Sequence, residues 1–225
     1  GTVSYGGISS KQSKPGFGIF GAWSKDGDEN GLVVRVAFSQ DKTAIESTRE
    51  ATGTAEAGFG RSGIKSTGYL LEASKGYVLD EAWTARPYIG YRQTTNKRAG
   101  YTEQSSVDVT APLTYSSLKQ TTETLTLGTT FAHALSAKTT MFLTAGVEHD
   151  LKNSIGRYAA ANETIGDIDS IDMASNKRKT RPTVSFALNH DIDKTQRLGV
   201  SLTHRKEAFA SGSTTSAFLQ YSKGF

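Results

Sequence analysis

The chain has 225 residues, 36% of them hydrophobic, and a mean hydropathy of −0.42, so no run of residues approaches a membrane-spanning helix. It contains no cysteine, which excludes a disulfide scaffold and thiolate metal sites. The formal net charge is +4, but the 26 Lys and Arg residues are scattered, so the sequence does not indicate a nucleic-acid-binding surface. The length fits a single domain over residues 1–225.

Apolar and polar residues alternate with a period of two along most of the chain, which predicts β-strands with one apolar and one polar face. Many of these runs reach the length of about nine to eleven residues that a transmembrane strand needs. The 23 Gly, 10 Phe and 9 Tyr residues also fit strands that are apolar on one face only. We expect about ten strands, in chain order near 2–10, 16–25, 31–46, 64–79, 83–100, 113–135, 138–151, 178–192, 196–209 and 213–225.

Short and long connections alternate between these runs. Tight polar turns are predicted at 24–31, 79–82, 135–138 and 191–194, and long connections at 47–63, 101–112 and 152–177. Residues 155–179 are rich in Asn, Asp, Ser and charge, and we expect a mobile loop there. Short turns on one rim and long loops on the other are typical of outer-membrane barrels. The sequence therefore predicts an all-β, antiparallel transmembrane β-barrel with short periplasmic turns and long extracellular loops.

The apolar register of the strands is expected to face lipid. It contains Val34, Val36, Leu127, Leu143, Val184, Phe186, Val200 and Leu202. Near the rim with the short turns the same register holds Trp23, Tyr77 and Trp83. Aromatic residues at one height are typical of a membrane interface, so we expect an aromatic belt there. Two unrelated core tryptophans of a soluble sandwich are the alternative.

The opposite register is expected to line the interior. Its charged residues are Arg35, Glu72, Arg86, Arg92, Glu148, Asp150 and Arg205. Three interpretations compete for them: a water-filled lumen with mutually screened charges, which we favour, a surface that keeps a passing unfolded chain solvated, or a catalytic site.

A catalytic dyad is the weakest of these interpretations. His149 lies between Glu148 and Asp150, but neighbouring residues on a strand face opposite ways. The four histidines are not spaced to converge on one metal ion. We expect no catalytic residues, no metal and no cofactor in the barrel.

The final run, 216–225, ends on an aromatic residue. Leu219, Tyr221 and Phe225 share a register with Lys223. This ending resembles the signal that the barrel-assembly machinery reads, and we expect Phe225 to matter for assembly more than for stability. The edge strand of a soluble sheet is the alternative.

Several segments, taken in order, are similar to the β-barrel translocator domain of autotransporters, the proteins of type V secretion. They are Gly68–Tyr77, Trp83–Tyr91, Thr124–Ala134, Phe142–Leu151 and the final hairpin. Two departures stand out. The family barrel has twelve strands against about ten here, and the family places a helix in the lumen, whereas no helix is indicated near residue 1. The resemblance is therefore to a domain lacking its first strands and lumen helix, or to a shorter variant.

The resemblance implies a monomeric barrel in a bacterial outer membrane that anchors or exports an N-terminal passenger. Its expected partners are outer-membrane lipid, its own passenger and the barrel-assembly machinery. The barrel itself is not expected to be an enzyme. The alternatives are a stand-alone outer-membrane channel, a surface protease barrel or a soluble all-β binding module.

Overall fold

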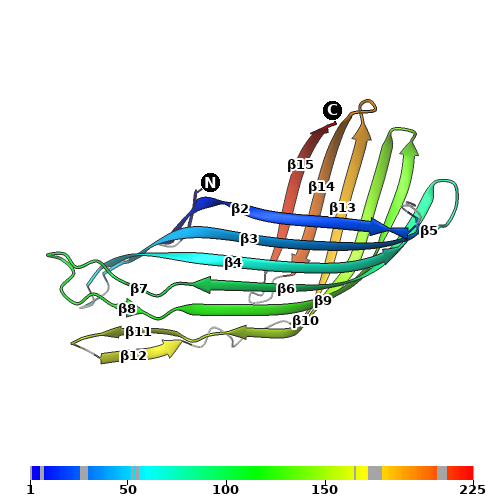
Figure 1. The fold of residues 1–225 in the computed structure, drawn as a ribbon. Helices are drawn as coiled ribbons and strands as arrows, with labels where there is room; N and C mark the ends of the chain where they lie inside the picture. Colours follow the sequence, from blue (N-terminus) through cyan, green and yellow to red (C-terminus); the bar gives the residue numbers. More distant parts are fainter. Residues whose placement is uncertain are drawn as a thin grey trace.

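The fold is built from antiparallel strands in two sheets (Figure 1). The computed structural model describes residues 2–5, 8–25, 30–51, 53, 56–164, 166–171, 179–206 and 212–224, with the backbone alone up to residue 15. The main sheet consists of β1 (Thr2–Tyr5), β2 (Ile8–Ser24), β3 (Leu32–Arg49), β4 (Gly58–Lys75), β5 (Tyr77–Val78), β6 (Trp83–Arg98), β9 (Leu118–Ser136), β10 (Thr139–Ile155), β13 (Thr180–Asp191), β14 (Gln196–Lys206) and β15 (Ser213–Lys223). The second sheet consists of β7 (Tyr101–Thr102), β8 (Thr114–Tyr115), β11 (Tyr158–Asn162) and β12 (Gly166–Ile171).

The main sheet curls into a half-barrel. Its strands follow the order β1-β2-β3-β4-β6-β9-β10-β13-β14-β15, and β13 to β15 rise on the far side of the curl in Figure 1. Among the described residues, no strand pairing joins β15 to β1 or β2. The predicted all-β antiparallel class and the count of about ten strands are confirmed. The described residues include no helix that is long and apolar enough to cross a membrane.

The N-terminal strands differ from the prediction. We expected separate strands at 2–10 and 16–25, but β2 runs without interruption from Ile8 to Ser24, and the reversal comes after Tyr5. Proline cannot donate a ladder hydrogen bond, so inside a sheet it is confined to edges and bulges. Pro15 lies where the pairing of β2 with β3 shifts register twice, between Gln12 and Phe17. These irregularities let the strand continue past the proline.

The short turns lie together at one rim, as predicted, and side chains hold them. Only Ala137 and Lys138 separate β9 from β10. The Asp80 carboxylate accepts hydrogen bonds from the backbone N–H groups of Ala82 and Trp83, both at 2.8 Å. The Asp193 carboxylate likewise accepts hydrogen bonds from the backbone N–H groups of Thr195 and Gln196, at 2.8 and 2.9 Å. Such Asx turns fix the reversal locally, because the side chain replaces a backbone partner.

The long connections are more ordered than predicted. The expected mobile loop over 155–179 instead contains β11 and β12, and β10 extends to Ile155; residues 172–178 lie outside the described part. The small sheet joins segments distant in sequence, in the order β12-β11-β8-β7. Tyr101, Tyr115 and Tyr158 stack through it with ring centroids 4.8 and 5.4 Å apart. Aromatic burial of this kind stabilises the small sheet where short strands alone would not.

The sheet has its apolar residues on the outside. Within the described residues, Val33 and Val109 are the only buried apolar side chains, whereas large apolar side chains of the outer register are exposed from β2 to β15. Long runs of exposed apolar surface are unfavourable in water. The convex face is therefore the apolar face of the sheet.

Candidate functional site: the concave face

Three cavities follow one another along the concave face of the half-barrel. Arg35, Glu72, Arg86, Arg92 and Glu148 line the first, of about 320 Å³. The second, of about 490 Å³, shares Arg35 and Arg86 and opens toward the short-turn rim. The third, of about 290 Å³, adds Arg205 to Arg92 and Glu148. Six of the seven charged residues predicted for the interior thus line these cavities, and the seventh, Asp150, contacts Arg181 of the third.

Several of the charged residues lie in one row of paired residues that crosses the sheet. Backbone pairing aligns Arg35, Glu72, Gly90, Thr126, Glu148 and Arg181 across β3, β4, β6, β9, β10 and β13. Arg35 donates a hydrogen bond to Glu72 at 2.9 Å at one end of this row. Arg181 lies 3.4 Å from Glu148 at the other end. The small residues between them leave room in the middle of the concave face.

The most buried cluster surrounds Asp150. Arg181 donates to both of its carboxylate oxygens, at 2.6 and 2.7 Å, and Thr124 donates at 2.8 Å. The Arg181 and Asp150 side chains are only 5% and 2% exposed. Glu148 accepts a further hydrogen bond from Arg92 at 3.2 Å. Two carboxylates and two guanidinium groups therefore form one network, which satisfies charges that would be costly to bury alone.

Tyr88 crosses the concave face beside this network. A Cβ atom built on Gly128 or on Gly146 would lie 2.5 Å from the Tyr88 hydroxyl. The ring can therefore lie across β9 and β10 only because both positions are glycine. Tyr88 fills part of the first cavity and narrows it.

Sequence reasoning missed Arg181 and Tyr88. Arg181 is an even number of residues from Thr183, which lies in the polar register, so the period-two pattern places it on the concave face. Tyr88 has the same parity as Arg86 and Arg92 on β6. The alternation of faces along a strand was therefore enough to place both residues on the concave face. Tyr88 was overlooked because an aromatic side chain is not expected among polar ones.

His149 does not belong to this network. Its Nδ1 atom lies 2.8 Å from the hydroxyl of Thr180, in the opposite register from Glu148 and Asp150. Over the described ranges, no three His, Asp or Glu side chains come together in a way that could hold a metal ion. The concave face offers paired charges and hydroxyl groups, which are suited to hydration and to weak polar contacts.

The convex face carries the residues predicted to contact lipid. Val34 is partly buried, while Val36, Leu127, Leu143, Val184, Phe186, Val200 and Leu202 are exposed. Trp23 and Trp83 lie at the ends of β2 and β6 nearest the short turns, and Tyr77 lies in β5 beside them. Trp83 stacks on His133 with ring centroids 4.3 Å apart. Contact with lipid and the aromatic belt remain predictions.

The last strand places Leu219 and Tyr221 on the same exposed face. Tyr221 donates a hydrogen bond to Gln196 at 2.6 Å, while Phe225 lies outside the described residues. The role of these three residues in assembly remains a prediction.

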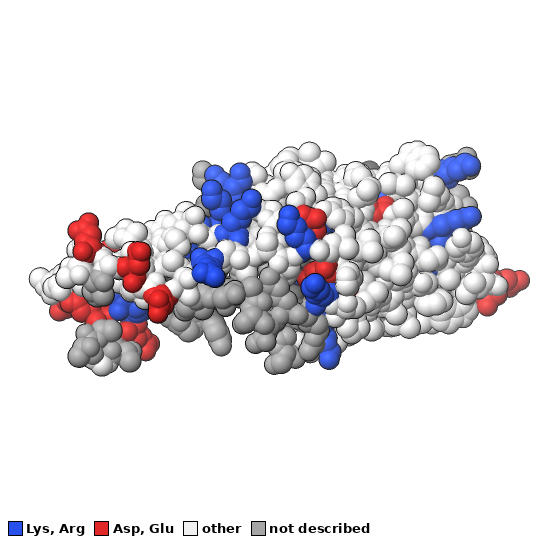
Figure 2. Space-filling view, turned by 90° about the horizontal axis from the view of Figure 1, so that it is seen from below, with Lys and Arg blue, Asp and Glu red and all other residues white. Residues whose placement is uncertain are grey.

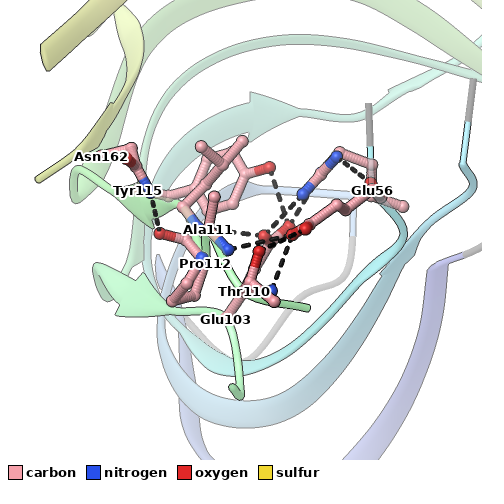
Figure 3. A network of polar contacts seen from close by, with 9 residues as sticks. Glu56, Glu103, Thr110, Ala111, Pro112, Tyr115 and Asn162 are labelled. Carbon is pink, nitrogen blue, oxygen red and sulfur yellow. Dashed lines mark hydrogen bonds and ion pairs between the residues drawn. The ribbon is translucent and has the colours of Figure 1, made fainter. Parts of the chain in front are cut away.

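A second polar network lies at the end with the small sheet (Figure 3). Glu103, with its side chain 3% exposed, accepts hydrogen bonds from Arg49 at 2.8 and 3.0 Å, from the Leu113 backbone at 3.0 Å and from Tyr115 at 3.2 Å. Arg49 also contacts the Glu56 carbonyl, and Glu56 binds the backbone of Thr110. The network ties the β3–β4 connection to the loop before β8.

These contacts shift the pKa values of Glu103 and Tyr115. Burial alone would raise the pKa of Glu103, but the Arg49 hydrogen bonds and the Leu113 N–H bring that pKa below its usual value. Burial and the charge of Glu103 raise the pKa of Tyr115 to about 12. Glu103 is therefore ionised and Tyr115 neutral at physiological pH.

A curled antiparallel sheet that is apolar outside and charged inside defines the class of transmembrane β-barrel domains. The family model for the autotransporter beta-domain matches residues 1–203. The chain therefore belongs to the autotransporter β-domain family. The resemblance, fold and translocator class predicted from the sequence are confirmed at this level.

The structural comparison agrees. The translocator domain of the autotransporter NalP from Neisseria meningitidis superposes with a TM-score of 0.70 at 17% identity, over 100% of this chain and 71% of that chain. This likeness shows the shared fold. A sequence comparison with curated proteins finds no match.

Proposed function

We propose that this domain lies in the bacterial outer membrane and serves as the route or anchor by which an N-terminal passenger polypeptide reaches the cell surface. The short-turn rim faces the periplasm and the small sheet faces outward. The observation that supports this proposal is the pairing of charges on the concave face. Glu72, Glu148 and Asp150 each have an arginine partner, so a passing chain meets fixed dipoles and water rather than apolar side chains.

The size of the interior limits what can pass. A closed sheet of about ten to twelve strands leaves an interior only modestly wider than one packed with side chains. An extended chain or a single helix fits, but a folded domain does not. The role we infer is transport and anchoring, without catalysis by the barrel. We infer a monomer, with outer-membrane lipid on the convex face and the barrel-assembly machinery recognising the C-terminal strand.

Surface display tests this function. The protein with its native upstream segment and an epitope at the passenger end is produced in bacterial cells, and added protease is used to detect the epitope on intact cells. A translocator exposes the epitope on the outside, with the barrel in the outer-membrane fraction. A stand-alone channel or a surface protease barrel leaves the epitope in the periplasm, and that outcome would contradict the proposal.

A further inference from the structure

Four lysines form a row on the convex face, near the small sheet. Backbone pairing places Lys42 opposite Lys65, Lys65 opposite Lys97, and Lys97 opposite Lys119, across β3, β4, β6 and β9. They lie in the outer register, and all four are exposed. We call Lys42, Lys65, Lys97 and Lys119 the lysine row.

Such a row is unfavourable without an anion. Side chains directly opposite on adjacent strands have Cβ atoms about 4.5–5.5 Å apart, and like charges at that distance destabilise the pair. Two acids of the outer register are already paired with other basic residues: Glu46 lies 2.9 Å from Arg61, and Glu123 lies 3.7 Å from Lys152. An anion bound beside Lys65, Lys97 and Lys119 would turn this repulsion into binding energy.

A groove accompanies the row. It has a volume of about 420 Å³ and is lined by Lys42, Lys65 and Lys97 together with small residues such as Ala44 and Gly63. Figure 2 shows Lys and Arg side chains gathered next to the acidic end of the molecule, and beyond them adjoining basic and acidic side chains followed by a mostly uncharged surface. The groove therefore combines positive charge with a small, mostly apolar floor.

The height of the row is that of a lipid headgroup. On β4, Leu71 and Tyr69 belong to the apolar band, and Lys65 lies four residues before Tyr69, toward the small sheet. Four residues span about 13 Å along a strand, and a tilt of about 40° reduces this to roughly 10 Å in height. The lysine stems can reach down over part of that distance.

We propose that the lysine row binds the phosphates of a membrane lipid whose headgroup carries more than one phosphate, in the leaflet that faces the small sheet. The groove receives one phosphate between Lys42, Lys65 and Lys97, and Lys119 extends the site to the neighbouring headgroup. This inference rests on the proposed membrane orientation of the convex face.

The full chain is tested in mixed micelles of detergent and phosphatidylcholine that contain diphosphorylated lipid A, its dephosphorylated form or neither. Binding is measured as retention of the labelled lipid by the purified protein in mixed micelles. Each lysine near an anionic headgroup contributes about five-fold in affinity, so Lys65→Gln, Lys97→Gln and Lys119→Gln together should weaken retention of lipid A about 100-fold. The original chain should retain the dephosphorylated lipid as weakly as the triple variant retains lipid A.

A matched variant removes the same charge from the opposite rim. Lys75→Gln, Lys138→Gln and Lys194→Gln together should retain lipid A as the original chain does, since these residues lie near the short turns. Equal retention by the two triple variants would overturn the inference, and so would equal affinity for the dephosphorylated lipid or for inorganic phosphate. Insertion into pure phosphatidylcholine vesicles separates the two proposals: a chain that inserts but does not prefer lipid A overturns this inference alone, whereas failure to insert both by this chain and by the protein with its native upstream segment contradicts the proposed function.

Discussion

The Arg181–Asp150 contact shows how a charge can be kept inside the half-barrel. Both side chains are almost fully buried, and Arg181 also reaches Glu148. A buried ion pair is not by itself a strong source of stability, because desolvation offsets the attraction. Removing one partner is costly, however, because the other charge stays buried and unpaired.

Arg181→Met should therefore destabilise the folded domain by about 3 kcal/mol, since Asp150 loses its two shortest hydrogen bonds. Urea unfolding in detergent micelles measures the change. Combining Arg181→Met with Asp150→Asn should recover a large part of the loss.

The exposed pair Arg61–Glu46 is the control for this prediction. Its side chains are 65% and 50% exposed, so Arg61→Met should cost less than about 1 kcal/mol. Equal losses at Arg61 and Arg181 would show that burial does not govern the Arg181 pair.

Along a strand, alternate residues lie on opposite faces of the sheet, so neighbouring side chains have different surroundings. Leu143 and Thr144 are neighbours on β10, but Leu143 is exposed on the convex face, while Thr144 lines the first cavity and lies 2.8 Å from Thr130. The two positions therefore offer a matched test of the two faces.

Leu143→Arg should cost roughly 2–4 kcal/mol of stability in a bilayer, because a charge near the midplane of the lipid face is poorly solvated. Thr144→Arg should cost less, because its guanidinium can remain hydrated. Reversible unfolding from lipid vesicles measures both. An unchanged stability for Leu143→Arg would mean that the convex face does not contact hydrocarbon.

The small sheet is the element whose stability should depend on pH. The ionised form of Glu103 is favoured in the fold, since its pKa lies below the usual 4.5. Its contribution is therefore complete above about pH 4.5 and disappears as the pH falls through the lower folded value. Glu103→Gln should imitate the acid form at neutral pH.

Hydrogen exchange measures this effect. Amides in 101–116 and 158–171 should exchange at least about tenfold faster in Glu103→Gln, because hydrogen bonds to a charged group are lost. Amides of β9 should be unaffected. Uniform acceleration in both sheets, or no change in either, would show that Glu103 does not hold the small sheet in place.

The period-two pattern can assign each charged residue to a face because a strand fixes that face locally. It could not predict which charges meet. The pairing of Arg35 with Glu72 depends on the register between β3 and β4, which the pattern within either strand does not give. The small sheet was missed because its short strands come from separate loops, and their partners are not visible in local sequence.

For the whole molecule, the interior should conduct ions. The cavities on the concave face are lined by more arginines than carboxylates, together with several threonines. Reconstituted in a planar bilayer, this chain should form an open or loosely gated pore. The protein with its native upstream segment should conduct less, because the family resemblance implies a passenger helix that fills the lumen.

Identical conductance of the two proteins would rule out this plug. If the chain alone fails to insert while the longer protein succeeds, the upstream segment contributes strands to the barrel. Single-channel recordings at matched salt concentrations distinguish these outcomes.

The long, unshifted pairing of β3 with β4 has a consequence for how the sequence can change in length. Eighteen residue pairs join these strands without a bulge. Adding one residue in the middle of β4 would turn every following side chain to the other face, so Glu72 would lie on the convex face and Leu71 on the concave face. Insertions of two residues keep the faces, and insertions of any length fit best at Gly53, where a positive φ marks an open turn. Length variation in this domain should therefore come in even steps within the strands and be unrestricted only at the loops.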